Sequence, residues 1–135
     1  MFVDASAIVA ILTGEAEADS LSAMLKDAPA PITSAVAVFE AVLGICRKYR
    51  IEVTEAHRLV QEFMAAAHMR TVPETDRETA AALEAFARYG KGRGHPAQLN
   101  MGDCFAYAVA RTHQVPLLFK GDDLDRTDIP LPSPR

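Results

Sequence analysis

The sequence predicts an α/β fold with a short, mostly parallel sheet and helices on both of its faces. Short apolar runs that are typical of buried strands alternate with longer segments whose apolar residues recur at helical spacing. Strands that alternate with helices favour a parallel sheet, because each helix returns the chain to the same end of the sheet. No internal repeat or linker interrupts the alternation, so we expect a single domain over residues 1–135.

The predicted strands are short, and the first begins at the second residue. They are Phe2–Val3, Ile32–Thr33, Thr71–Val72 and Pro116–Phe119, with Asp128–Ile129 as a further short edge strand. Pro29 and Pro31 end the segment before the second strand, and Pro73 stops the third, because proline lacks the N–H that a ladder or a helix needs.

The predicted helices are placed by their capping residues. They cover Ala5–Leu12, Glu15–Asp27, Ala35–Tyr49, Glu55–His68, a segment ending at Tyr89, and a last segment that opens at Asn100 or Met101. Ser34 is expected to cap the third helix and Thr54 the fourth. Thr75, with Glu78 three residues later, has the spacing of a capping box for the fifth.

Composition excludes some classes of protein. The chain has 14 Lys and Arg against 18 Asp and Glu, a net charge of −4, which argues against a surface built to coat nucleic acid. Cys46 and Cys104 lack partners at zinc-ligand spacing and are expected to be buried thiols. The start of the chain has no basic n-region, and no apolar run reaches the roughly 20 residues of a membrane span, so we expect a cytoplasmic protein without membrane contact.

Acidic residues mark several of the predicted element ends. Asp4 follows the first strand, Asp103 lies in the first turn of the last helix, and Asp122 and Asp123 follow the fourth strand. Glu40 lies on an apolar part of the long third helix, where a carboxylate is costly to bury unless it is paired or binds a metal.

Each acid also has a simpler structural interpretation. Asp4 is a good N-cap for the first helix, and acids near a helix N-terminus such as Asp103 are favoured by the helix dipole. Asp122 and Asp123 have the composition of turn residues, and Glu40 can reach water from the edge of its helix. No single one of the five acids is therefore strong evidence for a functional site, and only all of them together indicate one.

Taken together, the acids indicate a metal centre. The carboxyl ends of neighbouring parallel strands meet at one crevice, where open α/β sheets bind their ligands. Carboxylates gathered there repel and raise one another's pKa unless a cation neutralises them. An oxygen-only ligand set without His or Cys favours Mg²⁺ or Mn²⁺. Such a centre is typical of enzymes that hydrolyse the phosphodiester bonds of nucleic acids.

Four pieces of the sequence resemble the PIN domain family and, more narrowly, the VapC-type toxin ribonucleases of bacterial toxin–antitoxin pairs. The pieces are Asp-x-Ser after the first strand, a Glu in the third helix, Gly-Asp-Cys-Phe-Ala-Tyr-Ala at the start of a late helix, and Leu-Leu-Phe-Lys-Gly-Asp-Asp-Leu near the end. They stand in the family's order over nearly the whole chain. The resemblance implies a three-layer α/β/α PIN-like fold and a Mg²⁺-dependent endoribonuclease, neutralised by a cognate antitoxin and homodimeric.

The resemblance also implies roles for particular residues. Asp4, Glu40 and Asp103 correspond to the acidic centre that holds metal in the family. Ser6 corresponds to a polar neighbour that orients Asp4 or a water molecule, although a hydroxyl also serves the start of a helix by itself.

The fourth acid departs from the family pattern. Many PIN domains carry Thr-x-Asp/Asn-x-Asp-Phe after the last strand, whereas this chain has Phe119 in place of the Thr and Gly121 where the first Asp or Asn aligns. Either Asp122 or Asp123 is then expected to serve, and the other to shape the turn.

Basic residues near the acids are candidate RNA contacts. Lys91 and Arg93 lie in the glycine-rich loop before Asp103, and Lys120 comes just before the acidic pair. Cationic loops of this kind contact RNA phosphates. The alternatives are a solvated loop without a role and a lysine that only offsets nearby negative charge.

The alternative function is a catalytically silent PIN-like domain that binds a partner or RNA. The presence of Asp4, Glu40 and Asp103 together favours the enzyme.

Overall fold

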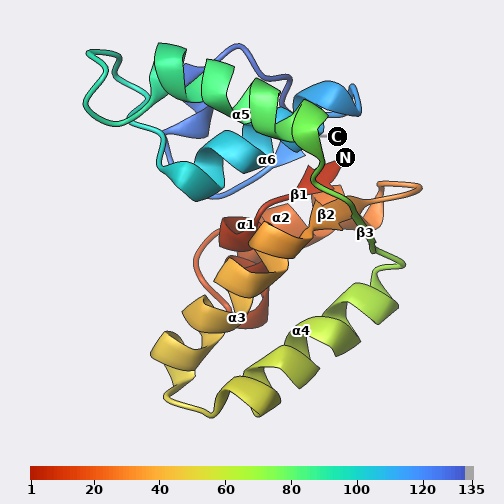
Figure 1. Cartoon of the computed structure of the whole chain (residues 1–135). Coiled ribbons are helices and arrows are strands. Elements are labelled where there is room, and N and C mark those ends of the chain that lie inside the picture. Colours follow the sequence, from red (N-terminus) through yellow and green to blue (C-terminus); the bar gives the residue numbers. More distant parts are fainter. Residues whose placement is uncertain (133–135) are drawn as a thin grey trace.

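A four-stranded parallel sheet forms the centre of the computed structural model, which describes residues 1–132 (Figure 1). The strands are β1 (Phe2–Val3), β2 (Ile32–Ser34), β3 (Arg70–Val72) and β4 (Leu117–Leu118). They stand in the order β3-β2-β1-β4, and each neighbouring pair is parallel. The expected parallel sheet is therefore confirmed, and β1 occupies an interior position.

Six α-helices lie within the described part of the chain. They are α1 (Ala5–Leu12), α2 (Ala18–Lys26), α3 (Ala35–Tyr49), α4 (Val53–Ala66), α5 (Asp76–Tyr89) and α6 (Met101–Thr112), and a 3₁₀ turn, η1 (Leu124–Arg126), follows β4. None of the helices in residues 1–132 combines the length and apolar character that crossing a membrane requires.

Alternate residues of the strands face opposite helical layers. Phe2 pairs in register with Ile32 and Leu117, and this buried row belongs to the core under α5 and α6. Val3 pairs with Leu118, and both belong to the core formed with α1, α2, α3 and α4. Figure 1 shows α5 and α6 on one side of the sheet and α1 to α4 on the other. The three-layer α/β/α arrangement is thus confirmed.

Local capping sets the bounds of two helices at the predicted residues. The Ser34 hydroxyl accepts a hydrogen bond from the Ala37 N–H at 3.2 Å, and α3 runs over Ala35–Tyr49 as expected. Thr75 and Glu78 form the predicted capping box of α5, in which Glu78 accepts from the Thr75 N–H at 2.9 Å. These interactions lie within a few residues in sequence, so the sequence alone predicts them.

The predicted starts of two other helices were wrong. Helix α4 begins at Val53, with Glu52 rather than Thr54 as its N-cap, because Glu52 is already extended and its carbonyl accepts the Ala56 N–H at 3.0 Å. Helix α2 begins at Ala18 rather than Glu15. The Glu15 N–H donates to the Ala10 carbonyl at 3.0 Å instead, which closes the turn after α1.

The predicted edge strand at Asp128–Ile129 was also wrong. This segment of the described chain is irregular, and side chains hold it against the core. The Tyr107 hydroxyl donates to Asp128 Oδ1 at 2.5 Å, and the Ile129 side chain is buried. The Leu117 N–H does donate to the Pro130 carbonyl at 3.0 Å, but proline has no N–H with which to continue a ladder.

We expect Tyr107→Phe to lower the free energy of unfolding by about 1 kcal/mol, because it removes a hydrogen bond to a partly exposed carboxylate. Urea unfolding followed by circular dichroism measures the change. Tyr49→Phe is the control, since the Tyr49 hydroxyl donates only to the exposed Leu12 carbonyl. A Tyr107→Phe variant as stable as the wild type would show that the Asp128 tether contributes nothing.

Candidate active site

Polar side chains gather where the four parallel strands end. Asp4 directly follows β1, Ser34 ends β2 and starts α3, and Glu74 stands two residues beyond β3. The loop 119–123 follows β4. Because all four strands are parallel, these positions share one edge of the sheet, which is the edge where open α/β sheets bind ligands.

Asp4 is buried and serves as the N-cap of α1. Its Oδ2 accepts hydrogen bonds from the Ser6 N–H at 3.1 Å and the Ser6 hydroxyl at 2.6 Å. The Ser6 Oγ in turn accepts the Lys120 N–H at 2.9 Å, so Ser6 links Asp4 to the loop after β4. Burial raises the pKa of Asp4, although the bonds from Ser6 oppose the rise. Asp4 therefore caps α1 and is at the same time one of the acids of the cluster.

Glu40 reaches from α3 to the start of α6. A Cβ added at Gly102 would overlap the Glu40 carboxylate, so the Glu40 side chain takes this position because residue 102 has no side chain. Burial, and then the negative charges of Asp4, Asp103 and Glu74, raise the pKa of Glu40 to about 7. The carboxylate makes no ion pair with a basic side chain of residues 1–132.

Asp103 occupies the first turn of α6 and combines two roles. It forms a capping box with Asn100, in which its Oδ2 accepts the Asn100 N–H at 3.1 Å and its own N–H donates to Asn100 Oδ1 at 2.9 Å. Burial raises the pKa of Asp103 to about 6, with further contributions from the charges of Asp4 and Asp123. The helix-terminal acid is therefore also an electrostatic neighbour of Asp4.

The two acids after β4 have different surroundings. Both side chains are exposed. Asp122 lines a pocket beside α2, together with Glu17 and Lys120. The charge of Asp123 acts instead on Asp103. The two residues, which the sequence left equivalent, therefore have different neighbours.

Glu74 is an acid of this edge that sequence reasoning missed. Its Oε1 accepts the Val36 N–H, in the first turn of α3, at 3.1 Å. Its Oε2 is buried and has no hydrogen-bond partner among the described residues, and its charge contributes to the raised pKa of Glu40. Glu74 follows the predicted third strand by two residues, as Asp4 follows the first strand. This position could have indicated Glu74 from the sequence.

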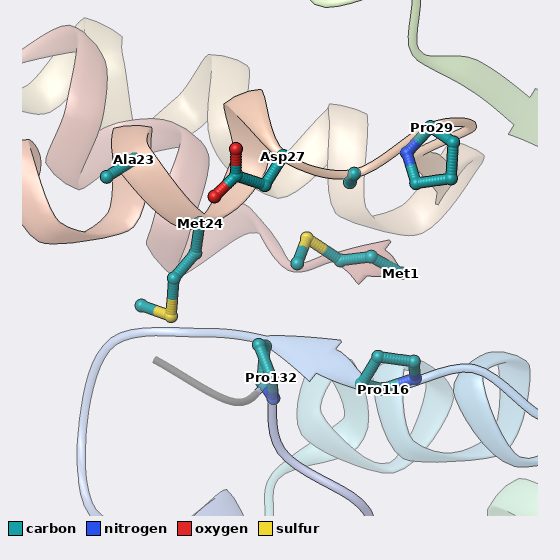
Figure 2. Close-up of a pocket in the computed structure, with 8 residues that line it drawn as sticks. Met1, Ala23, Met24, Asp27, Pro29, Pro116 and Pro132 are labelled. Atoms are coloured by element: carbon teal, nitrogen blue, oxygen red, sulfur yellow. The ribbon is translucent and has the colours of Figure 1, made fainter. Parts of the chain in front are cut away.

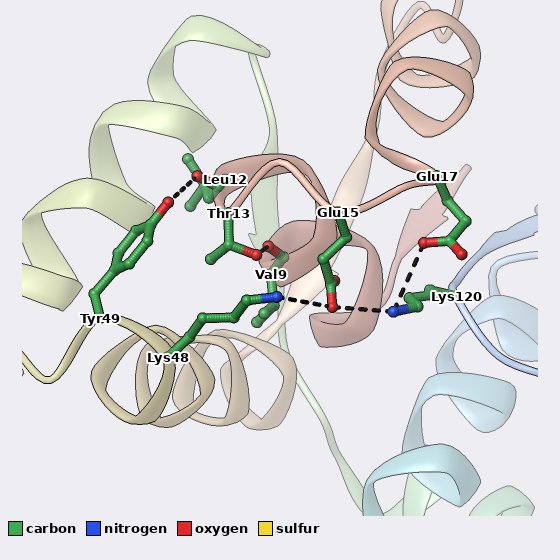
Figure 3. A network of polar contacts seen from close by, with 8 residues as sticks. All are labelled: Val9, Leu12, Thr13, Glu15, Glu17, Lys48, Tyr49 and Lys120. Atoms are coloured by element: carbon green, nitrogen blue, oxygen red, sulfur yellow. Dashed lines mark hydrogen bonds and ion pairs between the residues drawn. The ribbon is translucent and has the colours of Figure 1, made fainter.

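The Lys120 ammonium pairs with acids outside the acidic cluster. It pairs with Glu15 Oε1 at 3.0 Å and with Glu17 Oε2 at 3.6 Å, and Glu15 also pairs with Lys48 at 3.2 Å (Figure 3). The pKa of Glu15 is lowered, first by its hydrogen bond from Lys120. Lys120 thus offsets the negative charges of Glu15 and Glu17, between α1 and α2, and forms no ion pair with Asp122 or Asp123 in residues 1–132.

Lys91 and Arg93 are exposed in the loop between α5 and α6. The Arg93 guanidinium lies 6.0 Å from the centre of the Phe86 ring, and neither residue forms an ion pair within residues 1–132. Both remain predicted contacts for RNA.

The acidic cluster fits a hydrated hard cation. Across residues 1–132, no three acidic, His or Cys side chains are arranged as a ready metal cage, and no basic side chain pairs with Asp4, Glu40 or Asp103. Mg²⁺ needs no such cage, because it keeps several waters and takes one or two carboxylates. The carboxylates of Glu40 and Asp103, which are repelled by neighbouring acids and have no basic partner among the described residues, are suitable ligands for such an ion.

A separate pocket of about 380 Å³ lies at the opposite edge of the sheet (Figure 2). Met1 and Pro116, which come just before β1 and β4, line it together with Met24, Asp27 and Pro132. It therefore lies away from the acidic cluster and takes no part in the site.

The fold and the site define a three-layer α/β domain with carboxylates gathered at the ends of its parallel strands. Residues 1–130 match the family model of the PIN domain, and the chain belongs to the PIN domain family.

The similar proteins include VapC ribonucleases. The chain is 41% identical over 140 residues to a VapC ribonuclease of Rhizobium meliloti (strain 1021), covering 95% of this chain and 98% of that one. It is 39% identical over 129 residues to Ribonuclease VapC42 of Mycobacterium tuberculosis, covering 96% of each. The crystal structure of Mycobacterium tuberculosis VapC20, a sarcin-ricin loop cleaving toxin, superposes with a TM-score of 0.74 at 19% identity over 95% of both chains, which shows a shared fold.

Without divalent cation, the free energy of unfolding should fall as the pH rises from about 4.5 through about 7, because the folded chain binds the Glu40 proton more tightly than the unfolded chain. Glu40→Gln should therefore stabilise the protein at pH 8 by about 1–2 kcal/mol, a value discounted for solvent screening.

Urea unfolding in EDTA at pH 4 and pH 8 measures this difference, which should nearly vanish at pH 4. Glu84→Gln, at an exposed position of α5, is the control. A stability gain of the same size at both pH values would contradict the burial and repulsion inferred for Glu40.

Proposed function

We propose that this chain is a Mg²⁺-dependent endoribonuclease and the toxin of a toxin–antitoxin pair, with Mn²⁺ as a substitute ion. The observation that carries the proposal is the cluster of Asp4, Glu40 and Asp103, which come from three separate elements and act on one another's charge. Relatives named VapC ribonucleases, at 41% and 39% identity over nearly the whole chain, support RNA as the substrate.

The chain's own residues would hold the cation. Asp4, Glu40 and Asp103 supply the carboxylate oxygens, and the Ser6 hydroxyl and N–H keep the Asp4 side chain oriented. Gly102 leaves room for the Glu40 carboxylate beside α6. Burial and repulsion favour the protonated forms of Glu40 and Asp103, and these carboxylates would hold their charged forms beside a bound cation.

When bound, such a cation activates water and stabilises the charge that develops as a phosphodiester is displaced. Hydrolysis in this sense leaves a 5′-phosphate and a 3′-hydroxyl. We assign Asp123, rather than Asp122, as the fourth acid, because the charge of Asp123 acts on Asp103. Lys91 and Arg93 are the proposed phosphate contacts, and Lys120 joins them if RNA displaces Glu15 and Glu17 from its ammonium.

The decisive experiment is RNA cleavage by the purified, partner-free chain with and without Mg²⁺ or Mn²⁺, beside Asp4→Asn. Asparagine preserves the size of the side chain and removes its charge, so we expect cleavage to require the metal and to fall about 100-fold or more in the variant. Equal, metal-independent background in both folded proteins would favour the silent partner-binding domain instead.

The acids after β4 form a matched pair for a second test. Asp123→Asn is expected to lower metal-dependent cleavage about tenfold or more, whereas Asp122→Asn should change it less than about threefold. Initial rates at saturating Mg²⁺ measure both. The reverse order would assign Asp122 as the fourth acid.

An apolar groove between α3 and α4 supports the pairing with an antitoxin. Phe39, Leu43 and Val53 line this groove of about 350 Å³, and their side chains are 65%, 37% and 59% exposed. A contiguous exposed apolar surface is typical of a protein interface, and a groove between helices accepts the apolar face of an amphipathic helix. The cognate antitoxin is the proposed occupant, a homodimer the proposed assembly, and the cytoplasm the proposed location.

Val53→Asp should weaken binding of the cognate antitoxin at least about tenfold, because it places a charge in a desolvated apolar contact. It should leave RNA cleavage unchanged, since Val53 lies outside the acidic cluster. Leu83→Asp on α5, where the leucine is 64% exposed, is the matched control. Titration calorimetry distinguishes them, and equal affinities would place the antitoxin elsewhere.

A further inference from the structure

Glu74 joins the acidic centre without belonging to any of the motifs that identify the site. It stands two residues beyond β3 and accepts the Val36 N–H at 3.1 Å through Oε1. Glu40 follows Val36 by four residues in α3, so the two positions share one face of the helix on consecutive turns. The hydrogen bond between Glu74 and Val36 therefore lies one helical turn before Glu40.

The Glu74 carboxylate is held in place but not neutralised. Its Oε2 is buried without a hydrogen-bond partner, and no basic side chain of residues 1–132 forms an ion pair with it. A buried oxygen of this kind loses its hydration, and no hydrogen bond from the described residues compensates for the loss. Positive charge beside Glu74 is therefore favourable. The hydrogen bond from Val36 at 3.1 Å fixes this carboxylate one helical turn from Glu40, on the same face of α3.

We propose that Glu74 is a positioning residue of the metal centre, which anchors the first turn of α3 and adds negative charge that strengthens cation binding beside Glu40. This inference rests on the proposed function, because it assumes that the cluster binds a divalent cation. The alternative is that Glu74 only satisfies an N–H at the start of α3, as carboxylates at helix N-termini commonly do. The two roles differ in whether the charge or the hydrogen bond matters.

Three substitutions separate charge from hydrogen bond. Glu74→Gln keeps an oxygen that can accept the Val36 N–H but removes the charge. Glu74→Asp keeps the charge on a shorter side chain, and Glu74→Ala removes both. Glu84→Gln, at an exposed position of α5, controls for the loss of one negative charge far from the cluster.

The affinity of the full chain for Mn²⁺, measured by electron paramagnetic resonance, is the readout. We expect Glu74→Gln to bind Mn²⁺ roughly fivefold to tenfold more weakly than wild type, as the removal of a nearby charge predicts. Glu74→Asp should stay within about twofold of wild type, and Glu84→Gln should be unchanged. Urea unfolding of the same proteins shows whether any loss of affinity reflects loss of the fold.

Each failure is recognisable. Wild-type affinity in folded Glu74→Gln, together with loss of Mn²⁺ binding in Asp4→Asn, would reduce Glu74 to a helix cap and leave the proposed function intact. An equal loss of affinity in Glu74→Asp and Glu74→Gln would also overturn the charge role, and Glu74→Asp decides the matter if Glu74→Gln fails to fold. No Mn²⁺ binding by the wild-type chain would overturn the metal centre itself.

Discussion

The parallel pairing of β1 with β2 and β4 is the constraint on which the acidic centre depends. Phe2 lies opposite Ile32 and Leu117, so the strands end level with one another and release Asp4 and the start of α3 at the same edge. The buried Thr33 hydroxyl, which donates to the Val3 carbonyl at 2.9 Å, adds a side-chain tie between β1 and β2. With strands of only two or three residues, this register has few backbone hydrogen bonds to support it, and the two helical cores must hold it.

The acidic centre works against folding, and local interactions keep it in place. Burial disfavours the charges of Asp4, Glu40 and Asp103, and repulsion adds to this at Glu40 and Asp103, so these three groups contribute less to stability as the pH rises. Ser6 and Asn100 donate hydrogen bonds to two of these carboxylates. The third has no such donor within residues 1–132 and rests against a glycine of α6. Stability is thus lowered at the same place where we propose that a cation binds.

Helices whose caps are local were predictable, and contacts that depend on other elements were not. Ser34 fixes the start of α3 through a residue three positions away, and Thr75 does the same for α5. Asp128, in contrast, is held by Tyr107 of α6, and this tether replaces the strand that the apolar pattern suggested. The delayed start of α2 likewise depends on the turn that Glu15 closes with α1.

From the sequence alone we predicted the four strands of the sheet, the six helices, the family, and the places of Asp4, Glu40 and Asp103 within these elements. Only the folded chain shows that Glu40 lies against Gly102 of α6, that Glu74 accepts the Val36 N–H of α3 and that Lys120 pairs with Glu15. The difference lies in how far apart in the sequence the interacting residues are. A cap or an apolar period is read within a few neighbouring residues, whereas these contacts join segments tens of residues apart and exist only once the sheet register has aligned their ends.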